Sequence, residues 1–437
     1  MRDHSETRQV VERGCAIGEA TGLAIPADPA AMLKAGPEWL TAAFRAYGTL
    51  CPDNAVTRIA AAQSFAGGNS GDKLVLELDY ERPGPGLDRA LFVKFSRCLG
   101  DSFRDRRRAE LHGEVKLAAL SRHPNFPVPV AKPFFADFDP ASGTGVLITE
   151  RIRFGEGEIE PAVPKNMDHL LPNALDYYRA TTTALARLAG THQSGQISPE
   201  ADRLFPFDRA EAESALPLPW SPEEAGGKSR AIIRFIADCP SLFPASVASG
   251  DFAARLQDDV VRFAERDRPL RHFLHADSRL IALAHWNTHI DNAWFWRDGQ
   301  GVLRAGLLDW GMVRQMNLAT ALWGGLSGAR SELWDAHQDE LLALFVGELA
   351  AAGGAAITVD ELRMHLNLSV GMLTLALMLD TPALLTARMP DIASLSGLAD
   401  PGLQRDKVVQ GFLQTFVAAL NLWARNDFGR SLAELPD

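Results

Sequence analysis

The sequence lacks the features that identify several large classes of protein. Its four cysteines (Cys15, Cys51, Cys98 and Cys239) are scattered without Cys-x-x-Cys spacing, which indicates neither a disulfide framework nor a zinc cluster. The opening segment, MRDHSETRQVVERG, has no apolar core of the kind that signal peptides carry. The longest apolar stretch, residues 368–379, is shorter than the roughly 18 residues that span a bilayer. We therefore expect a cytoplasmic protein without a membrane span.

An excess of basic charge is also missing. The chain has 44 lysines and arginines against 55 acidic residues, a net charge of −11, and its pI is near 5.5. Domains that bind nucleic acid are typically basic, so we expect no nucleic-acid partner. Hydrophobic residues make up 46% and charged residues 23%, which is ordinary for a globular protein with a sizeable core. At about 150 residues per domain, 437 residues correspond to two or three folding units, or to one large two-lobed unit.

Hydrophobic periodicity predicts an α+β, two-lobed fold. Alternating apolar residues predict strands at 73–80, 90–95, 146–152, 280–285, 292–296 and 303–310. Helical spacing predicts short helices in the first 50 residues, a helix near 107–121, and mainly helices after residue 152. Residues 198–228, rich in proline, glycine and charge, are expected to form an irregular insertion. The predicted domains are a helical extension at 1–50, a β-rich lobe at 51–152 and a helical lobe at 153–437.

A glycine-rich segment, FAGGNSGDK, precedes the first predicted strand of the β-rich lobe. Its candidate binding residues are Gly67, Gly68, Ser70 and Gly71. Adjacent glycines let a backbone turn approach a polyphosphate closely, with N–H groups and a hydroxyl as donors. Taken alone, the segment is more typical of a flexible hairpin turn.

Two charged residues in the same lobe are candidates for an ion pair. Lys94 lies on the face of its strand opposite the apolar residues 91, 93 and 95. On the following helix, Glu110 and Glu114 compete to be its partner. Glu114 shares a stripe with apolar residues at i−3, i+1 and i+4, which places it on the inward face. Because a buried carboxylate needs a partner, we select Glu114.

The stretch from His285 to Asp309 contains a second set of polar residues. His285 is followed by Asn287 and by Asn292, and Asp309 ends a later apolar strand just before Trp310. A carboxylate at the end of an apolar strand needs a counter-charge, and a magnesium ion with Asn292 as second ligand would supply one. The alternative is an aspartate that caps a turn.

Taken in order, these motifs resemble the aminoglycoside phosphotransferase-like branch of the protein-kinase-like fold, including its choline-kinase-like and ecdysteroid-kinase-like relatives. The resemblance covers roughly residues 60–330 and rests on the ordered set: the glycine-rich segment, Lys94, Glu114, the strand around ITERI, the loop 285–292 and the Asp-Trp pair 309–310. It implies a small β-rich N-lobe and a larger helical C-lobe. It also implies that ATP and Mg²⁺ are the cofactors.

The resemblance implies a role for each matched residue. Lys94 would contact the α- and β-phosphates of ATP while pairing with Glu114. Glu150 and Ile152 would border the nucleotide where the strand leads into the linker between the lobes. Asn292 and Asp309 would hold magnesium, and the product would be the phosphate ester of a small-molecule hydroxyl.

One position departs from the family pattern. The family has a catalytic aspartate where this sequence has Asn287, and a neutral amide orients a hydroxyl but does not accept its proton. General-base assistance contributes about 10²–10⁴ in rate. His289 and Asp291 lie in the same loop and are candidate substitutes, although Asp291 could instead join the metal shell.

Three functions therefore remain open. The first is an ATP- and magnesium-dependent phosphotransferase, and the second is a non-catalytic nucleotide-binding pseudokinase, which Asn287 favours. The third is a zinc hydrolase, because His285 and His289 are four residues apart. That function has little support, since Trp286 stands where the glutamate of such a site would be and no third ligand is evident. Neither the acceptor nor the oligomeric state follows from the sequence.

Overall fold

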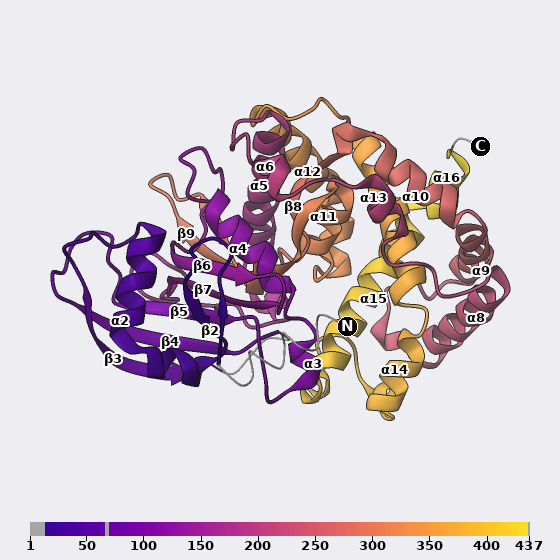
Figure 1. The fold of residues 1–437 in the computed structure, drawn as a ribbon. Coiled ribbons are helices and arrows are strands. Elements are labelled where there is room, and N and C mark those ends of the chain that lie inside the picture. Colours follow the sequence, from indigo (N-terminus) through magenta and orange to yellow (C-terminus); the bar gives the residue numbers. More distant parts are fainter. Residues whose placement is uncertain (1–13, 66–69, 436–437) are drawn as a thin grey trace. The chain divides into compact units, whose positions relative to one another are not determined.

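The computed structural model describes residues 14–65 and 70–435. The chain divides into two compact units. Unit 1 comprises Met1–Gly157 and Gly306–Val313, and unit 2 comprises Glu158–Ala305 and Arg314–Asp437. The ribbon is shown in Figure 1. Each unit is described by itself.

Unit 1 is built on a five-stranded antiparallel sheet of order β3-β4-β5-β7-β6. Its strands are β3 (Val56–Ser64), β4 (Lys73–Tyr80), β5 (Ala90–Phe95), β6 (Pro133–Asp139) and β7 (Thr144–Glu150). Strands β4 and β5 form where the sequence alternates, because alternate side chains of a strand point to one face. Leu74, Leu76 and Leu78 are accordingly buried together on that face.

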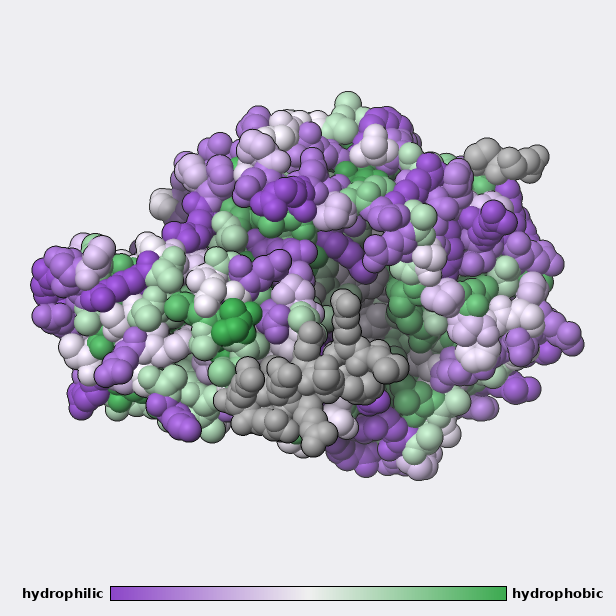
Figure 2. All heavy atoms as spheres, viewed as in Figure 1, coloured by the Kyte–Doolittle hydropathy of each residue, from purple (hydrophilic) through white to green (hydrophobic). Residues whose placement is uncertain are grey.

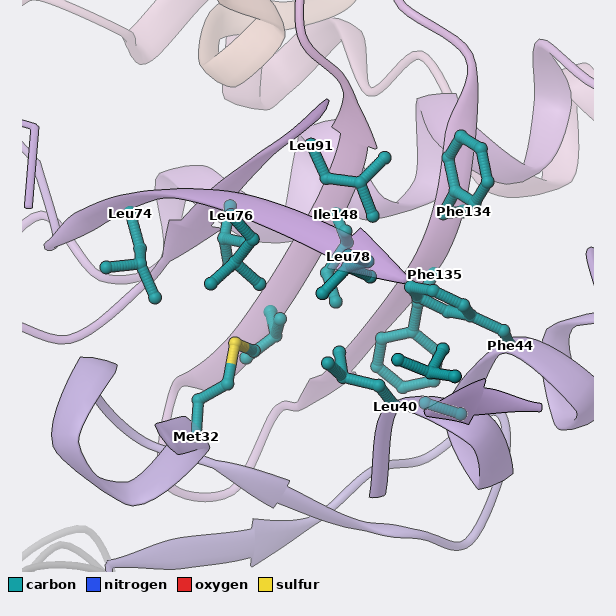
Figure 3. Packing of buried hydrophobic residues seen from close by; sticks show 14 of the residues in the cluster. Met32, Leu40, Phe44, Leu74, Leu76, Leu78, Leu91, Phe134, Phe135 and Ile148 are labelled. Carbon is teal, nitrogen blue, oxygen red and sulfur yellow. The ribbon is translucent and has the colours of Figure 1, made fainter. Parts of the chain in front are cut away.

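The main core of unit 1 lies between this face and helix α2 (Pro29–Tyr47). Met32, Leu40 and Phe44 of α2 meet the sheet leucines and Phe134 and Phe135 of β6, as Figure 3 shows. Burying each such side chain contributes about 1.5–3 kcal/mol. Asp28 caps the start of this helix, because its side chain accepts from the N–H of Ala31.

A short hairpin attaches the first described residues to the sheet. It consists of β1 (Cys15–Ile17) and β2 (Ala24–Pro26). The buried carboxylate of Asp137 in β6 accepts from the N–H groups of Ala20, at 3.0 Å, and Thr21, at 2.9 Å. Residues 14–50, predicted as a separate helical extension, are therefore part of unit 1, and only α2 in them is helical.

The other face of the sheet carries α4 (Glu110–Leu120), which follows the short helix α3 (Ser102–Asp105) in the chain, and the short helix η5 (Trp310–Met312) lies against α4. Helix α4 buries Leu111, Glu114 and Ala118, the stripe that the sequence predicts. Its Gly113 approaches η5, where an added Cβ would lie 3.6 Å from the Gly311 carbonyl oxygen. Residues 306–313 thus join unit 1 although their neighbours on both sides belong to unit 2.

Unit 2 is mainly helical. Its first helices are η1 (Asp168–Leu170), α5 (Ala174–Gln193), α6 (Ala201–Leu204), α7 (Arg209–Ser214), α8 (Pro222–Asp238), η2 (Pro240–Leu242), α9 (Gly250–Glu265), α10 (Asp267–Ala276) and η3 (Ser278–Leu280). The later helices are α11 (Leu318–Leu326), α12 (Ser331–Ala351), α13 (Val359–Leu377), α14 (Thr381–Arg388), η6 (Ile392–Ser394), η7 (Pro401–Arg405), α15 (Lys407–Asn426) and α16 (Phe428–Ala433).

Two short sheets accompany these helices. Strand β8 (Ile281–His285) pairs with β11 (Val313–Asn317), and β9 (Ala293–Arg297) pairs with β10 (Leu303–Leu307). Between β8 and β9 lies the single turn η4 (Ile290–Asn292). All five residues of β8 are buried, so this strand is a fixed support for the loop that follows it.

The outer helices of unit 2 expose polar residues. In the view of Figure 2, mostly hydrophilic residues cover the region around α8, α9 and α10. Within the described part of the chain, no single helix is both long and apolar enough to cross a membrane. Helices α13 and α14 pass that test only as a pair, bent by 53°.

The structure confirms the predicted α+β class, with a β-rich unit and a mainly helical one. Three details differ from prediction. Strand β7 ends at Glu150 and not at 152, and the first unit extends to Gly157. Residues 198–228 contain α6, α7 and the start of α8 between irregular stretches, so the segment is helical in part. Capping explains this: Ser221 and Glu224 form a reciprocal capping box that starts α8 inside a segment rich in proline and glycine.

Candidate functional site

In unit 1, Lys94 on β5 and Glu114 on α4 form a buried ion pair. The Lys94 Nζ atom lies 3.0 Å and 2.8 Å from the two carboxylate oxygens of Glu114. Both side chains are largely buried, with 16% and 8% of their surfaces exposed. Glu110 instead contacts Arg107, at 2.6 Å, near the start of the same helix. Glu114 is therefore the partner of Lys94, as the helical stripe predicts.

Asp309 supplies a second carboxylate to Lys94, with Oδ1 2.9 Å from Nζ. Its backbone is left-handed, at φ 62° and ψ 58°, a conformation that costs a non-glycine residue of the order of 1–3 kcal/mol. Its side chain makes no capping hydrogen bond to η5, so turn capping does not explain the residue. About half of the side chain, 49%, is exposed, which leaves the carboxylate open to a ligand.

The two carboxylates fix the charge of Lys94. Burial alone would lower the pKa of its ammonium group, but the charges of Glu114 and Asp309 and their hydrogen bonds outweigh burial. The pKa of Lys94 is therefore raised, and the side chain is a permanent cation at neutral pH. A fixed cation between an inward glutamate and a half-exposed aspartate is suited to hold an anionic ligand.

The described end of the glycine-rich segment turns tightly beside Lys94. Gly71 has φ +33°, and an added Cβ there would lie 1.7 Å from the carbonyl oxygen of Phe95, so only glycine fits. The guanidinium of Arg104 donates to the carbonyls of Ser70 and Gly71. Gly67 and Gly68 lie outside the described residues.

Glu150 and Ile152 lie at and just beyond the end of β7, and both are half-buried. The Glu150 carboxylate accepts from the N–H of Lys132 at 2.8 Å, and its own N–H donates to the Lys132 carbonyl at 2.9 Å. The Glu150 side chain is thus engaged in positioning the strand end. Its predicted contact with a nucleotide stays a prediction, as does that of Ile152.

In unit 2, the loop after β8 is held by its first residue and by α11. His285 is fully buried, and its Nδ1 accepts from the N–H of Asn287 at 3.0 Å. His285 therefore braces the first residues of the loop. Gly324 of α11 lies directly on the loop, since an added Cβ would be 1.8 Å from the Trp286 carbonyl oxygen.

The side-chain amides of Asn287 and Asn292 lie in this loop and differ in their hydrogen bonds. The Asn292 Nδ2 group donates to the Asn287 carbonyl at 3.0 Å, which fixes the direction of the Asn292 side chain. Within the described residues, the Asn292 Oδ1 oxygen and the Asn287 carboxamide have no hydrogen-bond partner. Both are half-buried. An oxygen suited to a metal ion and an amide suited to a hydroxyl are therefore available in one loop.

His289 and Asp291 line a small cavity together with Asp168 and Tyr178. The cavity leaves about 10 Å³, room for about one water molecule. Burial lowers the pKa of His289, so its imidazole is neutral at neutral pH. Burial also raises the pKa of Asp291, although the nearby His289 and Lys165 oppose that rise.

Asp168, Tyr178 and Lys73 are site residues that the sequence patterns do not identify. Asp168 is buried, and the Tyr178 hydroxyl donates to its Oδ2 oxygen. The apolar face of α5 is a sequence pattern from which the burial of Tyr178 could be predicted. Nothing in the sequence places Asp168 beside Tyr178. Lys73 occupies the first position of β4, directly opposite Lys94.

In the described part of the chain, protein side chains alone do not form a complete metal site. Among the described residues, no three histidine, cysteine or acidic side chains come together as a metal site. A zinc hydrolase site is therefore not found there. Magnesium differs, because it commonly takes one or two carboxylates and completes its shell with phosphates and water. Asp309 and Asn292 have oxygen donors of the required kind.

No protein-family model and no curated protein matches the chain. Solved structures align with it over most of its length. It is similar to a choline/ethanolamine kinase family protein from Mesorhizobium loti, at 16% identity over 86% of this chain and 92% of that one, with a TM-score of 0.43. It is also similar to a spectinomycin phosphotransferase solved with ADP and spectinomycin, at 13% identity over 84% and 94%, with a TM-score of 0.39.

A further similarity is to an ethanolamine kinase of Plasmodium vivax, at 11% identity over 82% of this chain and 81% of that one, with a TM-score of 0.39. These are the kinds of protein that the sequence motifs resemble. All three TM-scores lie below 0.5.

Proposed function

We propose that the protein is an ATP- and magnesium-dependent phosphotransferase that transfers the γ-phosphate to a hydroxyl group of a small molecule. The observation that carries this proposal is the ion-pair cluster of Lys94, Glu114 and Asp309. Phosphoryl transfer depends mainly on positioning and charge neutralisation, for which kinases use a strand lysine, a helix glutamate and a metal-binding aspartate. Lys94, Glu114 and Asp309 have these types and this arrangement, and Asp309 is held in a left-handed backbone conformation. Together they support a nucleotide site.

The residues of unit 1 fit a polyphosphate. Lys94 is a fixed cation, and the turn at Ser70 and Gly71 is the described end of the glycine-rich segment. The Nε atom of Arg104, beside that turn, is buried and has no hydrogen-bond partner in the described part of the chain. A donor left in this state is costly unless a ligand or solvent supplies an acceptor.

Asp309 and Asn292 would hold magnesium. When bound, the metal ion neutralises phosphate charge that develops during transfer. Asp309 binds Lys94 through Oδ1, and the Asn292 amide is oriented by its bond to Asn287. Both residues therefore have a fixed side chain before any ligand arrives.

The loop of unit 2 would orient the acceptor. In the reaction, the acceptor oxygen forms a bond to the γ-phosphorus, the bond from that phosphorus to the ADP oxygen breaks, and the hydroxyl proton leaves. Asn287 would hold the hydroxyl in line through its carboxamide. The proton would pass to His289, which is neutral, or to Asp291, whose raised pKa makes it a stronger base than an ordinary aspartate.

A second candidate function is nucleotide binding without catalysis, and Asn287 is the observation that favours it. The two functions share the site in unit 1 and differ only in turnover. A screen of small hydroxyl compounds, read by ATP consumption and by a mass increase of one phosphoryl group, separates them. Turnover that requires an acceptor establishes the enzyme, whereas binding without turnover establishes the pseudokinase.

Nucleotide binding itself is tested by thermal melting. At 100 times Kd, Mg-ATP should stabilise the protein by about 2.7 kcal/mol, which is visible as a rise in Tm. Asp309→Ala should remove the magnesium dependence of that rise. The matched control is Asp139→Ala, an aspartate at the end of β6 in the same unit. No rise with ATP or GTP, with or without magnesium, would exclude the nucleotide site.

A further inference from the structure

A groove of about 910 Å³ lies in unit 1 between the loop that joins β4 to β5 and the segment that joins α4 to β6. Small-molecule sites typically have volumes of about 300–1,000 Å³, so the groove is large enough for an organic ligand. Strand β4 begins at Lys73, opposite Lys94, and ends at Tyr80, just before that loop. At about 3.4 Å per residue, the ends of this strand are about 24 Å apart. The groove therefore lies at the end of β4 that is remote from the ion-pair cluster.

Asn54 and Asp53 hold the loop that forms one wall of the groove. The buried Asn54 side chain donates to the Arg82 carbonyl at 2.8 Å and accepts from the Arg82 N–H at 3.0 Å. The Arg82 guanidinium also pairs with Asp53 at 2.6 Å, and Asp53 is the only acidic residue in the described lining of the groove. The charges of Arg82 and Asp53 therefore compensate each other, and this wall is fixed before any ligand binds.

Arg122 and Lys132 line the same groove, and each is held by one carbonyl and one aromatic ring. Arg122 donates to the Tyr47 carbonyl at 2.7 Å, and its guanidinium lies 4.5 Å from the centre of the Tyr47 ring. The Lys132 ammonium donates to the Gly86 carbonyl and lies 5.1 Å from the centre of the Phe134 ring. Neither cation forms an ion pair with any residue that the structure describes.

Both cations retain donors for a ligand. A guanidinium has five N–H donors and an ammonium has three, so a bond to one carbonyl occupies only part of them. An anion would accept charge-assisted hydrogen bonds from groups whose positions are already fixed, which lowers the entropic cost of binding. The described lining thus offers two positive charges without acidic partners, although the whole chain carries a net charge of −11.

Much of the remaining wall of the groove is apolar. Val128 is buried, and Leu87, Phe126 and Val130 are half-buried. Covering such surface with an apolar ligand contributes about 25 cal/mol per Å² removed from water. A purely ionic ligand such as inorganic phosphate would leave this surface exposed. The lining therefore favours a ligand that has both an anionic group and an apolar body.

We propose that the groove binds a small organic anion. Arg122 and Lys132 hold its carboxylate or phosphate group, and the apolar wall covers its body. This site is independent of the proposed nucleotide site and adds a second ligand to the protein. The alternative is that the two cations only brace the loops around them. A brace would affect neutral and anionic ligands equally, whereas the proposed role affects anionic ligands alone.

The experiment measures Kd by calorimetry for octyl phosphate, octanoate and the neutral probe octanol. The variants are Arg122→Met, Lys132→Met, their double variant and the control Lys34→Met, which changes an exposed lysine of α2 in the same unit. For the double variant we expect the anions to bind about 10- to 100-fold more weakly, the range for losing hydrogen bonds to charged groups. Octanol should change less than about 2-fold because it has no charge for these groups to hold. Lys34→Met should bind all three probes like the parent.

The two anions identify the head group, since the one that binds more tightly shows whether the groove prefers a carboxylate or a phosphate. Arg122→Lys keeps a cation and should recover part of the affinity that Arg122→Met loses. Where the double variant does not fold, Lys132→Met alone makes the same comparison between the anions and octanol.

Three results would overturn the proposal. The first is a parent that binds neither anion, and the second is a double variant that binds them as the parent does. The third is an equal loss of affinity for octanol and the anions. Saturating Mg-ADP should leave the binding of both anions unchanged. Anion binding that Mg-ADP abolishes and the groove variants do not affect would place the anion in the nucleotide site and overturn the groove.

Discussion

The ion-pair cluster of unit 1 and the loop after β8 in unit 2 differ in how they manage charge. In the cluster, a buried cation is held by two carboxylates, and the arrangement is charged at every position. In the loop, the central positions Asn287 and Asn292 are neutral amides, and the acidic group Asp291 lies at the rim of a small cavity. The cluster thus has the charges that the proposed nucleotide site needs, whereas the central positions of the loop carry no group that accepts a proton. Binding and turnover can therefore be separated by substitutions made in one unit at a time.

The largest effect should come from breaking the charge arrangement of unit 1. Lys94→Met leaves Glu114 buried without its cation, so we expect the free energy of unfolding to fall by about 3–5 kcal/mol, together with loss of Mg-ATP binding. Urea unfolding and calorimetry measure the two effects. The double variant Lys94→Met, Glu114→Leu removes both charges and should recover most of the stability but none of the binding. Mg-ATP binding by the double variant would show that the cluster is structural only.

Unit 2 should be the more sensitive unit to mild acid because of His365 in α13. Burial, the largest influence, lowers the pKa of His365 to about 4, against 6.5 for an exposed histidine. Between these values the unfolded chain binds the extra proton and the folded chain does not, so stability is intact above pH 6.5 and falls as the pH drops toward 4. The loss should reach about 3 kcal/mol.

Unfolding monitored at pH 7 and pH 4.5 measures this loss. His365→Gln removes the titrating group and should flatten the difference between the two pH values. An unaltered pH difference in His365→Gln would assign the acid sensitivity to other groups.

Restoring the charge that the loop lacks is the direct test of catalysis. If proton removal limits the reaction, Asn287→Asp should raise kcat by about 10²-fold, while Mg-ATP affinity stays near that of the parent because the side chains are nearly isosteric. Steady-state kinetics and calorimetry with the same preparation separate the two quantities. An equal change in affinity and kcat would mean that Asn287 acts through binding.

If His289 or Asp291 already serves as base, Asn287→Asp should do little or reduce the rate. His289→Ala or Asp291→Ala should then abolish turnover while Mg-ATP still binds. Burial raises the pKa of Asp291, so a rate that depends on its ionised form should rise with pH at a higher pH than the ordinary value of about 3.9 would give. Fast turnover that survives all three alanine substitutions, at 287, 289 and 291, would exclude this loop as the catalytic one.

The smallest effect should follow from the glutamate that does not contact Lys94. Glu110 pairs with Arg107 across one helical turn, and both side chains are partly exposed. Glu110→Gln should change the free energy of unfolding by less than about 1 kcal/mol and leave Mg-ATP binding unchanged. A loss of binding as large as that of Glu114→Gln would show that the two glutamates share the role.

The sequence predicted those parts of the fold and site that have a local signal. Strands β4 and β5 alternate in hydrophobicity, and the stripe on α4 distinguished Glu114 from Glu110. Strand β3 went unnoticed because its outward residues are mostly small or polar and nearly all exposed. Asp168 and Lys73 were missed for a different reason, since their roles depend on which distant residue lies opposite. Strand register and contacts between residues far apart in the chain leave no pattern in the local sequence.

The division of the chain has a consequence for the order in which unit 1 is completed during translation. Lys94 is followed by Glu114 after 20 residues, but Asp309 follows only after 215. A ribosome therefore releases the lysine and its first carboxylate long before the second, and most of unit 2 is made in between. The nascent unit 1 can pair Lys94 with Glu114 early, yet it acquires the Asp309 carboxylate, the proposed metal ligand, only when residues 306–313 emerge. The proposed nucleotide binding should accordingly require a chain that extends to Val313 and be absent from a fragment that stops after Gly157.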